Sequence, residues 1–284
     1  MKNIINKVYK LLLLTSFIFS ASGCEDIIEV DLNSTDSKIV IEGSISDNNS
    51  KALVEITRTT DFYKPGIYEK VSGATIALKD NNGTSYSFVE ISNGLYESLD
   101  IIGESNVEYS LNVIAEGETY DAISTMPNQL VLDSLSIEEA PTRPGKDKDD
   151  GEKIIVHIYF QDQPNINDYC RFKLYNNGIQ LGGFYIYDDR LTDGNYIDYS
   201  LLLRPEQSKI KTGDKITVAL LSIDEVAFDY YKTANSINAS GSAHGGPSST
   251  SAAPTNPISN WSNKALGFFT AYTISKDSIV IKEK

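Results

Sequence analysis

Apolar and polar residues alternate in short segments along most of the chain after residue 37, and clusters of Asn, Asp, Gly and Ser separate these segments. Alternation with a period of two places successive side chains on opposite faces, which is the pattern of a half-buried β-strand. The first group of segments predicts strands at residues 38–45, 52–58, 74–79, 85–90, 94–97, 109–114 and 119–124. This part of the chain is therefore expected to be built from β-strands alone.

A second group of segments follows the break at Met126-Pro127. It predicts strands at residues 154–160, 169–175, 180–187, 196–203 and 215–221, with further strand-like segments at 265–274 and 278–281. The turn Asn176-Asn177-Gly178 is a typical hairpin signal. Seven short strands with evenly spaced turns favour an immunoglobulin-like β-sandwich over residues 37–127. The predicted fold class is mostly β, with a second β-rich domain over residues 128–284.

One amphipathic helix is expected within the second domain. Ser222-Ile223-Asp224-Glu225 fits a capping box, in which the Ser and Glu side chains satisfy backbone amides at a helix start. Apolar residues then recur at helical spacing and predict a stripe that lies on a sheet: Ile223, Ala227, Tyr230, Tyr231 and Ala234. Residues 235–260 are mostly Ser, Ala, Gly, Asn and Pro, so we expect a mobile loop there.

Trp261 is the only tryptophan and follows the predicted loop directly. Trp is over-represented among the residues that dominate protein interfaces, so one interpretation is that Trp261 or the loop contacts a partner. The alternative is that Trp261 packs the end of the loop onto the second domain.

The first 24 residues carry a targeting signal. Lys2, Lys7 and Lys10 precede a short apolar run, and small residues follow it up to Gly23. This order is that of a secretory signal peptide over residues 1–23, and the run is too short to span a bilayer. Because Cys24 follows the small residues directly, the segment resembles a bacterial lipoprotein signal, in which that Cys is acylated. An ordinary secretory signal with a chance Cys is the alternative.

An acidic segment follows the proposed lipid site. We interpret residues 24–36 as a tether, and more than one acyl chain on Cys24 would hold it durably at a membrane. Glu25 and Asp26 resemble the surface-export signal of Bacteroidota lipoproteins. A solvated tether without a signal is the alternative.

Charge and cysteine usage narrow the function classes. The formal net charge is −14 and no basic stripe is present, which argues against nucleic acid as a partner. Cys170 is the only cysteine besides Cys24, and it lies on the same strand face as Phe172 and Leu174. A buried structural thiol is therefore expected rather than a nucleophile.

The sequence offers no clear catalytic or metal-binding motif. Two histidines, His157 and His244, lie far apart in the sequence, and neither a zinc-ligand cluster nor a nucleophile elbow is present. We therefore expect no enzymatic activity and no cofactor. Two acidic loops are candidates for calcium binding, one with Asp147, Asp149, Asp150 and Glu152 and one with Asp188, Asp189 and Asp193. Both lack the ligand alternation of an EF-hand, so we interpret the first as a solvated linker and the second as a turn, and calcium binding is the alternative.

Several blocks of sequence resemble a Bacteroidota lipoprotein family known only as domain of unknown function 4249. The blocks cover almost the whole chain after the signal: Cys24-Glu25-Asp26, Ile39 to Ile45, Thr59 to Tyr63, Val71 to Ala74, Pro254 to Asn260, and Ala265 to Tyr272. Asn263-Lys264 departs from the family pattern, in which Gly is common just before the Ala-Leu-Gly block. The family has no established activity, so the resemblance implies no catalytic residue.

The resemblance does imply a location and a kind of partner. Genes of this family often lie beside genes for outer-membrane transporters driven by TonB. This implies an outer-membrane, surface-exposed lipoprotein that serves such a transporter as a non-enzymatic accessory or ligand-capture subunit. A free-standing surface adhesin or glycan-binding module, with exposed Tyr rings as stacking platforms, is the alternative.

Overall fold

The computed structural model describes residues 37–48, 51–60, 68–99, 101–140, 154–203, 210–241 and 256–282. Residues 37–284 form one compact unit. The described residues contain three β-sheets and one helix, which confirms the predicted fold class.

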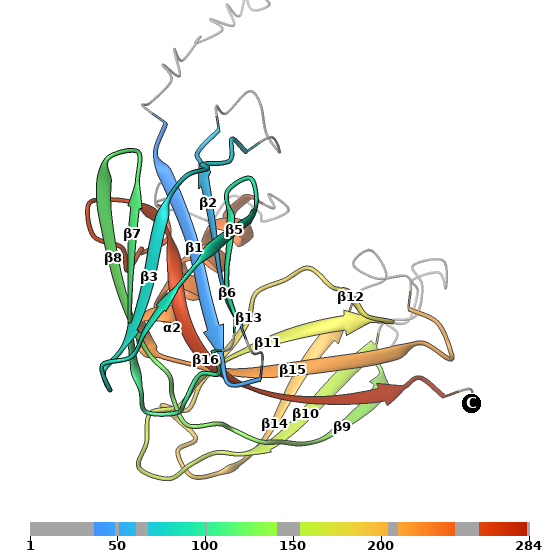
Figure 1. Cartoon of the computed structure of the whole chain (residues 1–284). Helices are drawn as coiled ribbons and strands as arrows, with labels where there is room; N and C mark the ends of the chain where they lie inside the picture. Colours follow the sequence, from blue (N-terminus) through green and yellow to red (C-terminus); the bar gives the residue numbers. More distant parts are fainter. Residues whose placement is uncertain are drawn as a thin grey trace, which may run out of the picture. The chain divides into compact units, whose positions relative to one another are not determined.

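A first β-sandwich is built mainly from the N-terminal strands. They are β1 (Ile39–Ser46), β2 (Lys51–Arg58), β3 (Thr75–Asp80), β4 (Ser85–Ser87), β5 (Val89–Ser92), β6 (Leu95–Leu99), β7 (Glu108–Ala115) and β8 (Glu118–Thr125). The four-stranded sheet β4-β3-β7-β8 packs on the part of the nine-stranded sheet made by β1, β2, β6 and β5 (Figure 1). Alternating side chains of the facing strands, such as Ile41, Val54 and Leu111, fill the core between them. The predicted strands of this region are therefore confirmed, except that 85–90 divides into β4 and β5.

A second β-sandwich follows in the chain. Its strands are β9 (Leu132–Glu139), β10 (Ile154–Gln161), β11 (Tyr169–Asn176), β12 (Ile179–Gln180), β13 (Tyr185–Asp188), β14 (Tyr196–Leu203) and β15 (Lys215–Ile223). The three-stranded sheet β14-β10-β9 packs on β11 and β15 around a separate core that contains Phe160 and Phe172. The predicted hairpin turn is confirmed, because Asn176 pairs with Ile179 across Asn177-Gly178. The predicted strand 180–187 is interrupted, since Leu181 to Phe184 separate β12 from β13.

Strand β16 (Leu266–Val280) belongs to both sandwiches (Figure 1). Its first half pairs in parallel with β1, from Leu266 opposite Val40 to Tyr272 opposite Ser46. Its second half pairs antiparallel with β15, from Thr273 opposite Ser222 to Val280 opposite Lys215. The two strand-like segments predicted at the C-terminus are thus one strand.

The shared strand also changes the predicted division at residue 127. Trp261, Ala265, Phe269 and Ala271 belong to the core of the first sandwich, although they lie far beyond that boundary. Residues 37–127 therefore do not contain their complete core.

Gly267, the glycine of the Ala-Leu-Gly block, occupies a backbone position where a side chain would not fit. Its φ is +88°, and a Cβ atom there would lie 2.2 Å from the carbonyl oxygen of Ile41 on β1. Glycine adopts this left-handed conformation without penalty and lets two backbones approach closely. Lys264, just before the block, also has a positive φ of 58°. The backbone thus favours glycine where this chain departs from the family pattern.

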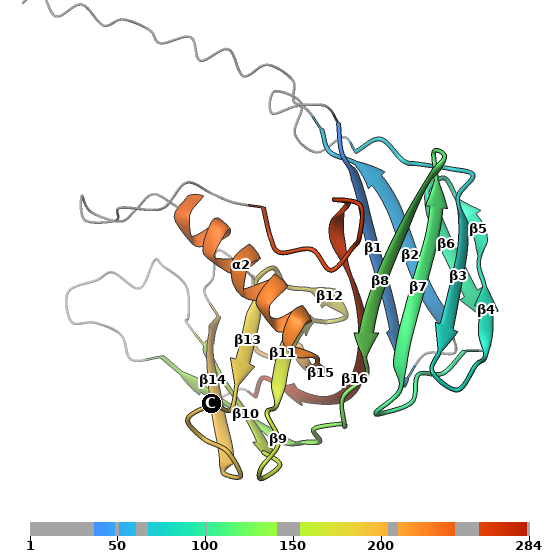
Figure 2. The same ribbon diagram turned by 90° about the vertical axis from the view of Figure 1, so that its left-hand side faces the viewer.

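Helix α2 (Glu225–Gly241) lies against β11, β13 and β16 (Figure 2). Its start differs from the predicted capping box. Ser222 is still part of β15, and its Oγ accepts a hydrogen bond from the Leu130 amide. The N-cap is Asp224, whose Oδ1 accepts the Ala227 amide at 2.8 Å. The strand pairing of β15 continues to Ile223, which moves the helix start two residues beyond the predicted cap.

The helix continues to Gly241, through residues that were predicted to belong to the loop 235–260. The rest of that predicted loop, up to residue 255, lies outside the described residues, as do the signal peptide, Cys24, Glu25 and Asp26. Within the described part of the chain, no helix has the length and apolar character needed to cross a membrane.

Candidate functional site

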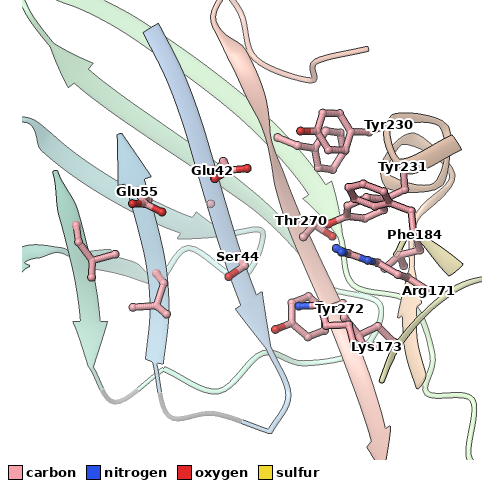
Figure 3. A pocket seen from close by; sticks show the side chains of 16 residues that line it. Glu42, Ser44, Glu55, Arg171, Lys173, Phe184, Tyr230, Tyr231, Thr270 and Tyr272 are labelled. Carbon is pink, nitrogen blue, oxygen red and sulfur yellow. The ribbon is translucent and has the colours of Figure 1, made fainter. Parts of the chain in front are cut away.

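A pocket lies on the face of the nine-stranded sheet that is turned away from the two sandwich cores, beside α2. Its volume is about 480 Å³. Strands β1, β2, β11 and β16 and helix α2 provide most of its lining (Figure 3): Glu42, Ser44, Glu55, Arg171, Lys173, Phe184, Tyr230, Tyr231, Thr270 and Tyr272. Strand alternation explains this set, because Phe172 and Leu174 point into the second core while Arg171 and Lys173 face the pocket.

One wall of the pocket combines cations with aromatic rings. The Arg171 guanidinium lies over the Tyr231 ring, 4.0 Å from its centroid, and 5.5 Å from the centroid of Phe184. Such stacking holds the planar guanidinium in one orientation while leaving its edge available for hydrogen bonds. Burial, with help from the neighbouring charges of Arg171 and Lys276, lowers the pKa of Lys173 to about 8. This wall therefore presents one permanent positive charge and one that is lost in mildly alkaline solution.

The opposite wall is acidic. In Figure 3, Glu42 and Glu55 lie across the pocket from Arg171 and Lys173, with Thr270 and Tyr272 between the two walls. Glu55 forms an ion pair with Lys70. Desolvation and the Glu55 charge raise the pKa of Glu42. The pocket thus separates positive from negative groups across a floor of hydroxyl and aromatic side chains.

Two buried polar atoms in the pocket have no hydrogen-bond partner among the described residues. They are Nε of Arg171 and Oγ1 of Thr270. A buried donor or acceptor without a partner costs about 1–3 kcal/mol, so most such groups in proteins are satisfied by protein, water or a ligand. These two atoms are therefore the best indication of where polar groups of a ligand would bind.

Trp261, the predicted partner contact, is buried with an exposed fraction of 6%. Its Nε1 donates a hydrogen bond of 2.9 Å to the carbonyl oxygen of Ile41. This position matches the alternative in which Trp261 packs the end of the loop. The core that Trp261 joins is that of the first sandwich, whereas the packing alternative placed it on the second domain.

Cys170 and His157 occupy structural positions. Cys170 is fully buried in the second core, and burial raises the pKa of its thiol well above the usual value. His157 lies on the outer face of β10, where Asp198 Oδ1 and Ser200 Oγ both approach its Nδ1, at 2.8 and 3.1 Å. Glu138 Oε1 lies 3.5 Å from the other ring nitrogen, Nε2, so acidic side chains flank the imidazole on both sides.

The first predicted acidic loop, with Asp147, Asp149, Asp150 and Glu152, lies outside the described residues. In the second loop, Asp188 forms a bidentate ion pair with Arg190, with distances of 2.7 and 2.8 Å. Asp193 is exposed in a turn, as predicted, but Asp189 is buried. This burial is not expected of a solvated acidic run.

Sequence reasoning missed the pocket residues. Tyr230 and Tyr231 were assigned to the apolar stripe of the helix, and both do contact the sheet. Arg171 and Lys173 alternate with the apolar residues Cys170 and Phe172, and this alternation indicated that one face of the strand is polar. It did not indicate which elements cover that face. A pocket that joins β1, β11 and the C-terminal strand depends on pairings that no local pattern reveals.

The fold and the pocket define a class of protein: two β-sandwiches that share one long sheet, with a ligand-sized pocket on its free face. A family model described as "Domain of unknown function (DUF4249)" matches residues 25–278. The chain therefore belongs to the DUF4249 family. None of the curated proteins matches this chain in sequence.

Solved structures of other β-sandwich proteins are similar to parts of the chain. A two-domain fibronectin type III segment of chicken tenascin is 12% identical with a TM-score of 0.23, over 66% of this chain and 91% of that one. The Yersinia pseudotuberculosis adhesin InvE is 16% identical with a TM-score of 0.20, over 66% and 55% of the two chains. Red sea bream transglutaminase is 9% identical with a TM-score of 0.24, over 88% of this chain and 32% of that one. At these TM-scores the likenesses carry no functional argument.

Proposed function

We propose that this protein is an outer-membrane, surface-exposed lipoprotein that captures a ligand for a TonB-dependent transporter and has no enzymatic activity of its own. The proposed lipid anchor is based on Cys24 and the signal that precedes it. The proposed transporter partner is based on the family resemblance. The observation that supports ligand capture is the pocket in which Arg171 Nε and Thr270 Oγ1 are buried and find no hydrogen-bond partner in the described part of the chain.

The chemistry of the pocket favours a small ligand that carries an anionic group. Arg171 and Lys173 lie on adjacent alternating positions of β11, where a carboxylate or phosphate would receive charge-assisted hydrogen bonds. The rings of Tyr231 and Phe184 offer flat apolar surface to the body of the ligand. The acidic wall with Glu42 would exclude ligands that are anionic at both ends.

The capture of a ligand is tested with the native protein isolated from its own membrane in mild detergent. Native mass spectrometry should detect a bound small molecule, and Arg171→Met should remove most of it. Lys79→Met is the matched control, because Lys79 is exposed on β3 and does not line the pocket. Raising the pH from 7 to 9 should release an anionic ligand, since Lys173 loses its proton near pH 8 and with it a favourable charge. A bound species that Arg171→Met leaves in place would contradict the pocket assignment.

The location and the partner are tested separately. Cys24→Ser should release a folded protein from the membrane, and neutralising Glu25 and Asp26 should leave it lipidated but shielded from protease added to intact cells. Co-purification in mild detergent should recover an outer-membrane transporter with the acylated protein. Recovery of the protein alone, under conditions that preserve other transporter complexes, would contradict the accessory role.

A glycan-binding module is the second candidate, and one observation favours it. His157, Tyr159 and Tyr196 form a row of nearly parallel rings on the outer face of β10 and β14, with centroid separations of 6.1 and 6.4 Å. Tyr196 is 57% exposed, and exposed aromatic faces are the usual platforms for sugar rings. Binding to immobilised glycans that is lost in Tyr196→Ala and kept in Arg171→Met would favour this candidate over ligand capture.

A further inference from the structure

Three aspartates from two separate loops meet beside the second sandwich. Asp162 follows β10, and Asp189 and Asp193 lie in the segment between β13 and β14. One carboxylate oxygen from each of the three lies within 4.8 Å of the other two. Like charges at this separation repel one another, so a protein rarely holds them together without a compensating group.

Two of the three aspartates in this cluster are buried, so water cannot easily stabilise their charges. Asp162 is 0% exposed and Asp189 is 1% exposed, while Asp193 faces solvent. Asp168, just before β11, is also buried beside them, and its Oδ2 accepts the amide of Gln163. Within the described part of the chain, no Lys or Arg forms an ion pair with Asp162, Asp189 or Asp193.

The backbone fixes one oxygen of each carboxylate in this cluster. Asp162 Oδ2 accepts the Gly194 amide at 2.8 Å, and Asp189 Oδ2 accepts the Asp168 amide at 2.9 Å. Asp193 Oδ1 accepts the Asn165 amide at 2.8 Å. The remaining oxygens of the two buried side chains, Asp162 Oδ1 and Asp189 Oδ1, have no hydrogen-bond partner among the described residues. Two oriented, buried and unpartnered carboxylate oxygens are what a metal site would require.

We propose that Asp162, Asp189 and Asp193 form a calcium-binding site that fastens the β10–β11 loop to the β13–β14 loop. Calcium prefers carboxylate and carbonyl oxygens at 2.3–2.6 Å in flexible geometry, so ligands on opposite sides of the ion lie about 4.6–5.2 Å apart. The three oxygens lie within 4.8 Å of one another, which is close enough for all of them to contact one such ion. Asp193, which is exposed, leaves one side open for waters to complete the coordination. Magnesium is less suitable, because it demands near-ideal octahedral ligands at 2.0–2.1 Å.

A proton shared between neighbouring carboxyl groups is the competing explanation for the cluster. In that case one carboxyl would donate a hydrogen bond to its neighbour, the repulsion would be relieved without a cation, and added calcium would leave the protein unchanged. The two explanations therefore differ in what calcium does at neutral pH, and the experiment measures this directly.

The purified full chain in mild detergent is treated with EDTA and then titrated with Ca²⁺ while its melting temperature is measured. Calcium at about 100 times its dissociation constant should raise the melting temperature by about 5 °C or more. Asp189→Asn and Asp193→Asn should each weaken calcium binding by at least about tenfold. Asp189→Asn should also raise the melting temperature of the EDTA-treated protein, because it removes one buried charge from the cluster. Asp133→Asn on β9 is the matched control, since it changes the same charge at an exposed position outside the cluster.

Terbium luminescence provides a readout that does not depend on stability. The Tyr187 hydroxyl forms a hydrogen bond with Thr192 in the same loop, so this ring should sensitise terbium bound between the aspartates. Calcium should displace the terbium signal, and Asp193→Asn should reduce it at unchanged fold. No calcium-dependent shift at millimolar calcium would overturn the proposal. So would a shift or a terbium signal that both Asn variants leave intact.

Discussion

Trp261 shows how one side chain closes a core built from distant parts of the chain. Its indole ring lies among the core residues of the first sandwich, and its N–H reaches the backbone of β1 across 220 residues of sequence. Asn260 beside it donates to the Phe269 carbonyl oxygen and accepts the Phe269 amide, at 2.8 and 3.0 Å. This pair of residues therefore fixes the segment before β16 onto the sheet.

We expect Trp261→Ala to lower the free energy of unfolding by about 3–5 kcal/mol, because it leaves a large cavity in a close-packed core. Trp261→Phe keeps most of the packing and should cost about 1–2 kcal/mol through the lost hydrogen bond. Urea denaturation of both variants measures the difference. Loss of partner binding in Trp261→Ala with unchanged stability would instead support the interface role that the sequence suggested.

At the scale of single residues, the sequence predicted well where a local pattern decides. The alternation around Cys170 correctly indicated a buried thiol. The burial of Asp162 and Asp189 was not predictable, because each lies in a polar loop and is buried only by the meeting of two loops. The pocket residue Thr270 gave no signal either, since its function depends on neighbours from β11 and α2.

One side chain, Asp224, fixes the start of helix α2 to a neighbouring strand. Asp224 caps the helix through Oδ1, while its Oδ2 accepts hydrogen bonds from Ser124 Oγ and the Thr125 amide at the end of β8. Ser124 Oγ also accepts the Ala271 amide of β16. One carboxylate therefore caps the helix and also links it to the first sandwich.

We expect Asp224→Ala to destabilise the protein by about 2 kcal/mol, because it removes the cap and leaves a buried hydroxyl and an amide without their acceptor. Asp229→Ala is the matched control, since Asp229 is exposed in the same helix and makes no comparable side-chain contact that fixes its start. Thermal denaturation measures both. An equal effect of the two substitutions would mean that helix propensity, rather than the cap, accounts for the loss.

Among the elements, strands with clear alternation were predicted to within about two residues of their ends. Strand β9 was missed, because its sequence Leu132 to Glu139 is largely polar and partly exposed.

The predicted capping box was wrong for a different reason. Ser222 and Glu225 fit the local signature, but pairing with β11 keeps the chain extended up to Ile223. The local sequence allows the helix to be capped at Ser222 or at Asp224, and the pairing of β15 with β11 determines that Asp224 is the cap.

For the molecule as a whole, the sequence predicted the two groups of strands but not that they share a sheet. The parallel pairing of β1 with β16 joins segments at opposite ends of the described chain, and no turn signal announces it. The nine-stranded sheet, the pocket on its free face and the position of Trp261 all follow from this one pairing.

We expect residues 37–127 expressed alone to remain largely unfolded. This fragment lacks Trp261, Ala265, Phe269 and Ala271 from its core, and the edge of β1 that pairs with β16 would be exposed. Circular dichroism during heating should show no cooperative transition for the fragment and a single one for residues 37–284. A cooperative transition in the fragment would restore the two-domain division at residue 127.

The pairing of β1 with β16 also sets the order in which the protein can be completed. The chain is made from its N-terminus, so β1 exists long before the strand that covers its edge. Until β16 has been made, that edge can pair with strands of other chains, and contacts so distant in sequence form slowly. A protein with this topology therefore depends on its β1 edge being kept from contact with other chains until β16 has paired with it.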